Sequence, residues 1–125
     1  MKYFIVENLS KIIVKLIKDT RAGTLKWDDD STYVESGEDR IIGKPYSATL
    51  NGQILRIYKY RHKHYTDFDQ FNWSESYRIE FIDVEGNSEW IFPNTSSIGD
   101  LYEAVTYQVS NVDNFFDDYL DDKDT

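Results

Sequence analysis

The chain has 125 residues, of which 40% are hydrophobic and 30% charged, and its formal net charge at pH 7 is −9. This length suits a single domain, residues 1–125, that buries roughly two thirds of its unfolded surface. The absence of Cys excludes disulfides, thiolate metal ligands and thiol nucleophiles. The negative charge argues against direct nucleic-acid binding, which depends on basic residues that neutralise phosphates.

The apolar stretch at the start of the chain, Tyr3 to Val6, is interrupted by Glu7. A secretory signal needs a longer apolar region, and no later run approaches the ~20 apolar residues of a membrane helix. We therefore expect a cytoplasmic protein that does not contact a membrane.

The first predicted element is an amphipathic helix over residues 6–20, with apolar residues at spacings of three and four and basic residues opposite. The apolar set is Leu9, Ile12, Ile13, Leu16 and Ile17, and the basic set is Lys11, Lys15 and Lys18. Gly23 fits a left-handed C-cap. The alternation of residues 24–27 predicts a strand, and the acidic, aperiodic residues 28–40 predict a mobile loop.

The dipeptide Asn51-Gly52 fits the positive φ angles of a type I′ turn. Residues 46–50 and 53–60 on either side alternate as strands, so we expect a β-hairpin. Its register places Ala48, Leu50, Leu55 and Ile57 in the core, and Thr49, Ile54, Arg56, Tyr58 and Tyr60 on the outer face.

A polar and aromatic stretch, residues 62–74, separates this hairpin from two further predicted strands, 77–82 and 89–92. A C-terminal helix begins at Ser97, and its apolar periodicity continues to Leu120. The element order predicts an α+β fold with an N-terminal helix, an antiparallel sheet meander of four to five strands and a C-terminal helix, both helices on one face of the sheet. Residues 121–125 are predicted to be a frayed acidic tail.

Patterns for catalysis and metal binding are weak. His62 and His64 are the only histidines and project to one face of a strand, but a zinc site needs three or four ligands. Residues 64–66 form one H-x-T triplet, whereas two-histidine phosphoesterases carry two. A nucleophile elbow and a phosphate-binding glycine loop are both missing. We expect no enzymatic activity, no metal and no cofactor, although converging carboxylates remain an alternative.

A basic and aromatic patch on the outer sheet face is the main candidate site. Arg and Tyr supply planar donors and rigid contact area at binding sites. The candidate residues are Arg56, Tyr58, Tyr60, Arg61, His62, His64, Trp73 and Arg78, and Lys59, Lys63 and Tyr65 lie in the same patch. The alternative is that β-propensity alone enriches Tyr in these strands.

Acidic residues crowd the C-terminal helix, where each costs ~0.3 to 1 kcal/mol against the helix dipole. The set is Asp113, Asp117, Asp118, Asp121 and Asp122. Either the last turn frays into solvent, or these acids face a basic partner or a cation.

Two sequence patterns stand near the ends of the chain. Thr20, Gly23, Leu25 and Trp27 form T-x-x-G-x-L-x-W, and residues 101–115 read L-Y-x-x-V-x-x-Q-V-x-x-V-D-x-F. Together they resemble a group of small, uncharacterised bacterial proteins built as helix, sheet meander and helix. The resemblance implies the fold and carries no activity.

The leading functional hypothesis is a non-enzymatic interaction or accessory module, related to bacterial immunity or defence, that binds another protein. The first alternative is a protein that binds a small anionic ligand, such as a nucleotide, through the outer-face residues. A weaker alternative is an acidic mimic of DNA. A homodimer through the outer-face residues Ile54, Tyr58, Ile82 and Ile91 is a further alternative for the oligomeric state.

Overall fold

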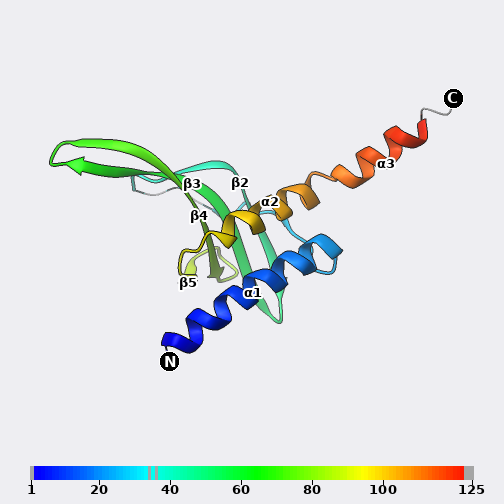
Figure 1. Ribbon diagram of the computed structural model, residues 1–125, viewed down its shortest axis with the longest axis horizontal. Helices are drawn as coiled ribbons and strands as arrows, with labels where there is room; N and C mark the ends of the chain where they lie inside the picture. Colours follow the sequence, from blue (N-terminus) through cyan, green and yellow to red (C-terminus); the bar gives the residue numbers. More distant parts are fainter. Residues whose placement is uncertain (1, 34, 36, 123–125) are drawn as a thin grey trace.

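The computed structural model describes residues 2–33, 35 and 37–122. Its elements in chain order are α1 (Lys2–Ala22), β1 (Asp28–Asp29), β2 (Arg40–Leu50), β3 (Gln53–Asp67), β4 (Gln70–Ile82), β5 (Ser88–Ile91), α2 (Ser97–Val109) and α3 (Val112–Asp122). The five strands pair antiparallel in chain order (Figure 1), which confirms the α+β class and the sheet meander. Within the described residues, none of the helices is long and apolar enough to cross a membrane.

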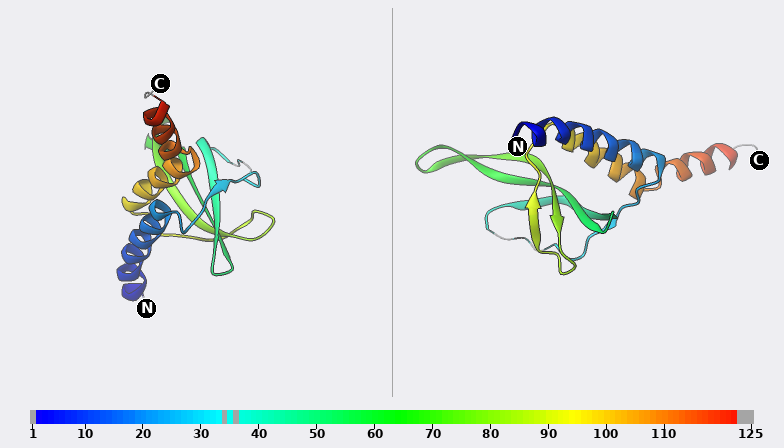
Figure 2. Two further views of the ribbon diagram at one scale, coloured as in Figure 1. Left: turned by 90° about the vertical axis from the view of Figure 1, so that its right-hand side faces the viewer. Right: turned by 90° about the horizontal axis from the view of Figure 1, so that it is seen from below.

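The core is formed by residues of α1, α2 and the sheet. α1 and α2 lie side by side (Figure 2), and α2 contacts β3 and β4. The buried apolar cluster includes Leu9, Ile13 and Leu16 from α1, Ile98, Leu101 and Val105 from α2, and Ala48, Leu55, Ile57 and Ile79 from the sheet. Ile12, predicted to face the core, is 47% exposed because it lies to one side of the buried stripe of α1.

A hydrogen-bonded clasp joins the end of α1 to α2. The side-chain amide of Gln108 donates to the carbonyl oxygens of Thr20 at 2.8 Å and Leu25 at 2.7 Å, and its oxygen accepts from the backbone N–H of Trp27 at 2.8 Å. The Trp27 indole donates to the Thr20 hydroxyl at 3.0 Å. We call these four residues the Gln108 clasp. The two sequence patterns near the chain ends therefore meet in one structural contact.

The predicted strand over residues 24–27 is wrong. The backbone N–H groups of Thr24 and Leu25 both donate to the carbonyl of Asp19, at 3.0 and 3.1 Å, and Gly23 has a φ of +80°. These donors cap α1 and are not available for strand pairing, which begins only at Asp28. The predicted loop over residues 28–40 contains β1 and the buried Asp30; its mobility stays a prediction.

Residues 62–74, predicted to separate two strands, instead extend both of them. β3 and β4 pair continuously from Arg61 opposite Glu75 to Tyr65 opposite Phe71. Aromatic side chains favour strands and supply cross-strand pairs, which explains why this stretch stays extended. The hairpin reaches beyond the rest of the sheet (Figure 1, green). We call residues 61–75 the aromatic arm.

The predicted single C-terminal helix is two helices. Asn111 has a φ of +55°, and the N–H groups of Ser110 and Asn111 donate to Thr106 and Gln108, which ends α2. A new helix starts at Val112 and extends away from the sheet (Figures 1 and 2). Residues 123–125 of the predicted frayed tail lie outside the described residues, and the earlier part of that tail belongs to α3.

Replacement of Gln108 by Ala tests the clasp. The variant loses three hydrogen bonds and leaves the Trp27 N–H without its partner, so the free energy of unfolding should fall by about 2 to 3 kcal/mol. Denaturant unfolding measures this loss. Glu103→Ala on the exposed side of the same helix should change it by less than about 0.5 kcal/mol. Equal effects of the two substitutions would contradict a structural role for the clasp.

Candidate functional site

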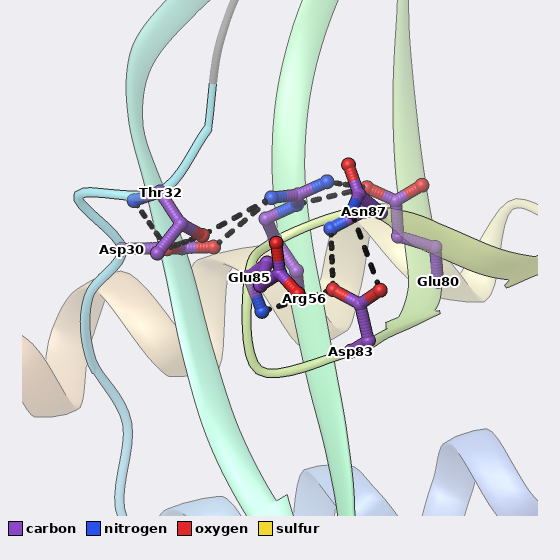
Figure 3. Close-up of polar contacts among 7 residues, drawn as sticks. All are labelled: Asp30, Thr32, Arg56, Glu80, Asp83, Glu85 and Asn87. Carbon is purple, nitrogen blue, oxygen red and sulfur yellow. Dashed lines mark hydrogen bonds and ion pairs between the residues drawn. The ribbon is translucent and has the colours of Figure 1, made fainter.

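A buried ionic cluster lies on the sheet face opposite the apolar core. Arg56 of β3 and Glu80 of β4 are cross-strand partners, with 4% and 2% of their surfaces exposed. The Nε and Nη2 atoms of Arg56 each lie 2.8 Å from Oε2 of Glu80, and Nη1 lies 3.4 Å from Oδ2 of Asp30 (Figure 3). We call Asp30, Arg56 and Glu80 the Arg56 cluster. Its two carboxylates satisfy the guanidinium from two sides.

The segment after β1 covers this cluster. Oδ1 of Asp30 accepts hydrogen bonds from the backbone N–H and the hydroxyl of Thr32, at 2.8 and 2.6 Å. The backbone N–H of Asp30 donates to Pro45 at 2.9 Å. The ring of Tyr33 lies over the guanidinium of Arg56, which is 5.1 Å from its centroid. The cluster therefore attaches the acidic segment to the sheet.

The turn between β4 and β5 also contacts the segment after β1, where Gly86 lies against Thr32. Asp83 accepts from the backbone N–H groups of Glu85 and Asn87, both at 2.9 Å (Figure 3), and these hydrogen bonds, led by that of Asn87, lower the pKa of Asp83. Gly86, in this turn, has a φ of +92°, and a Cβ there would lie 2.5 Å from the side chain of Thr32. Only glycine allows this close approach.

Arg56 and Tyr58 lie on the outer face of the sheet, as predicted, but both side chains are buried. Residues 30–33 cover both side chains, and the Arg56 donors are occupied by carboxylates. Of the residues named for a homodimer face, Tyr58 and Ile82 are buried whereas Ile91 is 48% exposed, and the homodimer stays a prediction. Simple alternation along a strand does not reveal that a loop covers the second face of a sheet.

Arg78 borders a hollow of about 400 Å³ next to the Arg56 cluster. Its Nη1 and Nη2 atoms donate to the hydroxyls of Tyr58 and Tyr60, each at 3.0 Å. Burial raises the pKa of Tyr58 to about 12, and the negative charge of Glu80 adds to the shift. Among the described residues Arg78 has no ion-pair partner. The lining carries two arginines and the three carboxylates Asp39, Glu80 and Glu85, so positive charge is not concentrated there.

The two histidines lie on this same face without a metal-binding arrangement. The Nε2 atom of His62 lies 3.2 Å from the Ser76 hydroxyl, and the exposed His64 pairs across the strands with Asn72. Within the part of the chain that the structure describes, no group of three His, Asp or Glu side chains is arranged to hold a metal ion.

The opposite face of the aromatic arm carries a ladder of rings and cations. The ring of Phe71 lies 5.7 Å from Tyr65 and 5.8 Å from Trp73, between centroids. The guanidinium of Arg61 lies 4.9 Å from the Trp73 ring, and the ammonium of Lys63 lies 4.4 Å from the Phe71 ring. These rings are exposed, Trp73 at 45%, and Phe68 at the tip is 96% exposed.

This ladder continues the core face of the sheet. Side chains at every second position of a strand share one face. In β3, one face therefore carries Leu55, Ile57 and Lys59, followed by Arg61 and Lys63. The same holds in β4, where Phe81, Ile79 and Tyr77 are followed by Glu75, Trp73 and Phe71. The rings of Tyr77 and Tyr102 of α2 meet at 5.5 Å. Beyond that contact the face extends past α2 and the aromatic side chains are exposed.

The structure therefore divides the predicted site into two faces. Arg61 and Trp73 lie on the core-facing side of the strands, and Arg56, Tyr58, Tyr60, His62, His64 and Arg78 lie on the other. Phe68 and Phe71 were not predicted as site residues, whereas Lys63 and Tyr65 belong to the predicted basic and aromatic patch. The alternation of odd-numbered residues from 61 to 65 is the sequence signal for this face.

Acidic side chains and exposed rings lie on different sides of α3. Asp113, Asp117 and Asp121 recur at a spacing of four, and the intervening Phe115, Phe116 and Tyr119 are 63%, 51% and 69% exposed. Asp113 also accepts a hydrogen bond from the Tyr107 hydroxyl. Because exposed rings occupy one side of α3, the helix is not an acidic surface all round, and DNA mimicry stays a prediction.

Comparisons with protein-family models, curated proteins and solved structures gave no match to this chain. The resemblance to small bacterial proteins therefore rests on the two sequence patterns alone.

Removal of the Arg56 guanidinium should be strongly destabilising. Arg56→Ala leaves two buried carboxylates without their cation, and the expected loss of unfolding free energy is about 3 to 5 kcal/mol. Arg61→Ala on the same strand removes an exposed cation and should cost less than about 1 kcal/mol. The comparison is made by denaturant unfolding, and a small loss for both variants would show that the cluster contributes little.

Alkaline titration tests the environment of Tyr58. Its pKa is raised from 10.0 to about 12, so the neutral phenol stabilises the folded state below pH 10, and this contribution is lost as the pH rises from 10 to about 12. Tyrosinate absorbance should show a late step that Tyr58→Phe removes. A variant that keeps the full late step would contradict the assignment.

Proposed function

We propose that the protein is a non-enzymatic interaction module that binds a partner protein through the aromatic arm. The observation that carries the proposal is the exposed ladder of Tyr65, Phe71 and Trp73, which continues the core face of the sheet past the end of its helical cover. Exposed contiguous apolar surface of this kind marks interaction sites in soluble proteins.

The chemistry of the arm suits a protein partner. Trp, Tyr and Arg dominate binding hot spots because they give large rigid contact areas with polar ends. Arg61 stacks on Trp73 and forms no ion pair with the described residues, so its charge is available to an acidic group. Lys63 is already paired with Glu38 at 2.7 Å. The favoured partner surface is an apolar patch with a carboxylate at its edge.

A small anionic ligand is the second candidate. It is favoured by one observation, the guanidinium of Arg78 beside the hollow without an acidic partner among the described residues. Three carboxylates in the lining and the coverage of Arg56 weigh against it. Affinity purification with variants of each site distinguishes the two candidates.

Affinity purification from cells that encode the protein tests the proposal, with quantitative mass spectrometry of proteins and small molecules. The bait variant is Phe71→Ser/Trp73→Ser, and the matched control is Asn72→Ser/Ser74→Ala on the opposite face of the arm. A protein that binds directly should be recovered with the wild type and with the control. Its Kd for the Phe71→Ser/Trp73→Ser variant should be at least about 30-fold higher than its Kd for the wild type.

Retention of every protein partner by the Phe71→Ser/Trp73→Ser variant would overturn the proposal. A small molecule retained by that variant but lost with Arg78→Ala would support the second candidate. Circular dichroism and unfolding of each variant establish that the comparisons are between folded proteins.

A further inference from the structure

We infer that β4 pairs antiparallel with β4 of a second copy of this chain, along the part of its edge that no strand of its own sheet covers. The contact uses the backbone edge of β4, whereas the proposed partner site is the ring face of the aromatic arm. It joins two five-stranded sheets into one continuous sheet.

The edge of β4 is open over most of its length. β5 pairs with β4 only at residues 80–82, and the N–H of Phe92 adds one hydrogen bond to the carbonyl of Ile79 at 3.0 Å. β5 therefore lies at the end of β4 away from the tip of the arm (Figure 1). Within the described part of the chain, no strand lies beside residues 70–78 on that side. Such an edge is a template for another strand.

The backbone groups on this edge can be assigned to particular residues. The carbonyl of Ile79 points away from β3, since it accepts from Phe92 on the β5 side. The N–H and C=O of one residue in an antiparallel strand point to the same side, and the side alternates along the chain. Residues 71–82 of β4 pair with β3 without a register shift. The open edge therefore presents the N–H and C=O groups of Phe71, Trp73, Glu75 and Tyr77.

These groups have no hydrogen-bond partner among the described residues. They recur at about 7 Å, the spacing of two residues along a strand. Only another extended backbone presents donors and acceptors at the same interval, so the chemistry of the edge selects a strand as its occupant.

The other edges of the sheet carry features that prevent strand pairing. β1 and β5 are only two and four residues long. The outer edge of β2 contains Pro45, which has no N–H, and a register shift before Tyr46. Just before β2, Glu38 contacts Lys63 where β3 continues into the arm. Short strands, prolines and bulges protect edges from association. Residues 71–78 of β4 have neither a proline nor a register shift.

Symmetry favours a second copy of this chain as the added strand. A two-fold axis at Ser74 places Phe71 opposite Tyr77 of the second copy, and Trp73 opposite Glu75. Every residue with open backbone groups then meets another such residue, so all of these groups are paired. The two open edges cover each other, and association stops at a dimer.

Charge favours the same register. Glu75 is the acidic residue of this open stretch, and a two-fold axis at Glu75 would place two carboxylates directly opposite each other. With the axis at Ser74, Glu75 of the second copy lies opposite Trp73. The guanidinium of Arg61 lies 4.9 Å from that ring and forms no ion pair with the described residues. The carboxylate therefore approaches a cation across the interface.

A proline substitution tests the backbone pairing. Glu75→Pro removes an N–H that points to the open edge and leaves the hydrogen bonds to β3 intact. Glu75→Thr is the matched control, because it removes the same carboxylate and keeps the N–H. We expect wild type and Glu75→Thr to form dimers by sedimentation velocity at about 0.15 M salt. The dimer Kd of Glu75→Pro should be at least about 10-fold higher, since two hydrogen bonds between the copies are lost.

A disulfide cross-link tests the register without proline. The chain has no Cys, so Ser74→Cys places a single thiol at the two-fold axis. The two Ser74 residues form a non-hydrogen-bonded pair with Cα atoms about 4.5 Å apart, which suits a disulfide. Ser74→Cys should therefore become a covalent dimer under mild oxidation. Asn72→Cys is the control, because it lies opposite Ser76 of the second copy. It should cross-link when mixed with Ser76→Cys and not with itself.

Circular dichroism and denaturant unfolding establish which variants are folded. The inference is overturned if wild type is monomeric at every concentration, or if folded Glu75→Pro associates as tightly as Glu75→Thr. It is also overturned if Ser74→Cys does not cross-link, or if Asn72→Cys alone cross-links as readily as Ser74→Cys. A monomeric wild type that still loses its protein partner in the Phe71→Ser/Trp73→Ser variant would overturn the dimer alone and leave the proposed function in place.

Discussion

The arrangement of this structure depends on the difference in length between a helix and a strand with a similar number of residues. A helix rises 1.5 Å per residue, so the 13 residues of α2 span about 20 Å. A strand rises about 3.3 Å per residue, so the 15 residues of β3 span about 50 Å. The helix therefore covers only part of the long hairpin. The covered part forms the core with Leu55, Ile57 and Ile79, and the remainder is the aromatic arm.

The second face of the sheet is organised by charge. Arg56 and Glu80 form a cross-strand ion pair. The remaining donor of the Arg56 guanidinium, Nη1, lies next to Asp30 in the segment after β1. Buried ion pairs often add little net stability, but removal of one partner is costly. The main effect of the Arg56 cluster is therefore to position the segment after β1 on the sheet. Its net contribution to the stability of the fold is smaller. It also occupies a guanidinium that would otherwise be the natural anion-binding group of this face.

The two exposed apolar surfaces share one physical origin. In the aromatic arm and in α3, an element continues past the point where the rest of the chain can cover it, and its apolar side chains remain exposed. The two surfaces differ in charge, since the arm carries Arg61 and Lys63 and α3 carries aspartates.

The sequence by itself determined the elements that depend on residues close together in the chain. The three- and four-residue spacing of Leu9, Ile13 and Leu16 predicted α1, and Asn51-Gly52 predicted the hairpin between β2 and β3. The tertiary structure alone decided which groups meet across long sequence separations. Asp30 lies 26 residues from Arg56, and Gln108 lies 88 residues from Thr20. The burial of Arg56, the break at Asn111 and the exposure of the arm depend on what packs against each element, and periodicity along one strand or helix does not contain that information.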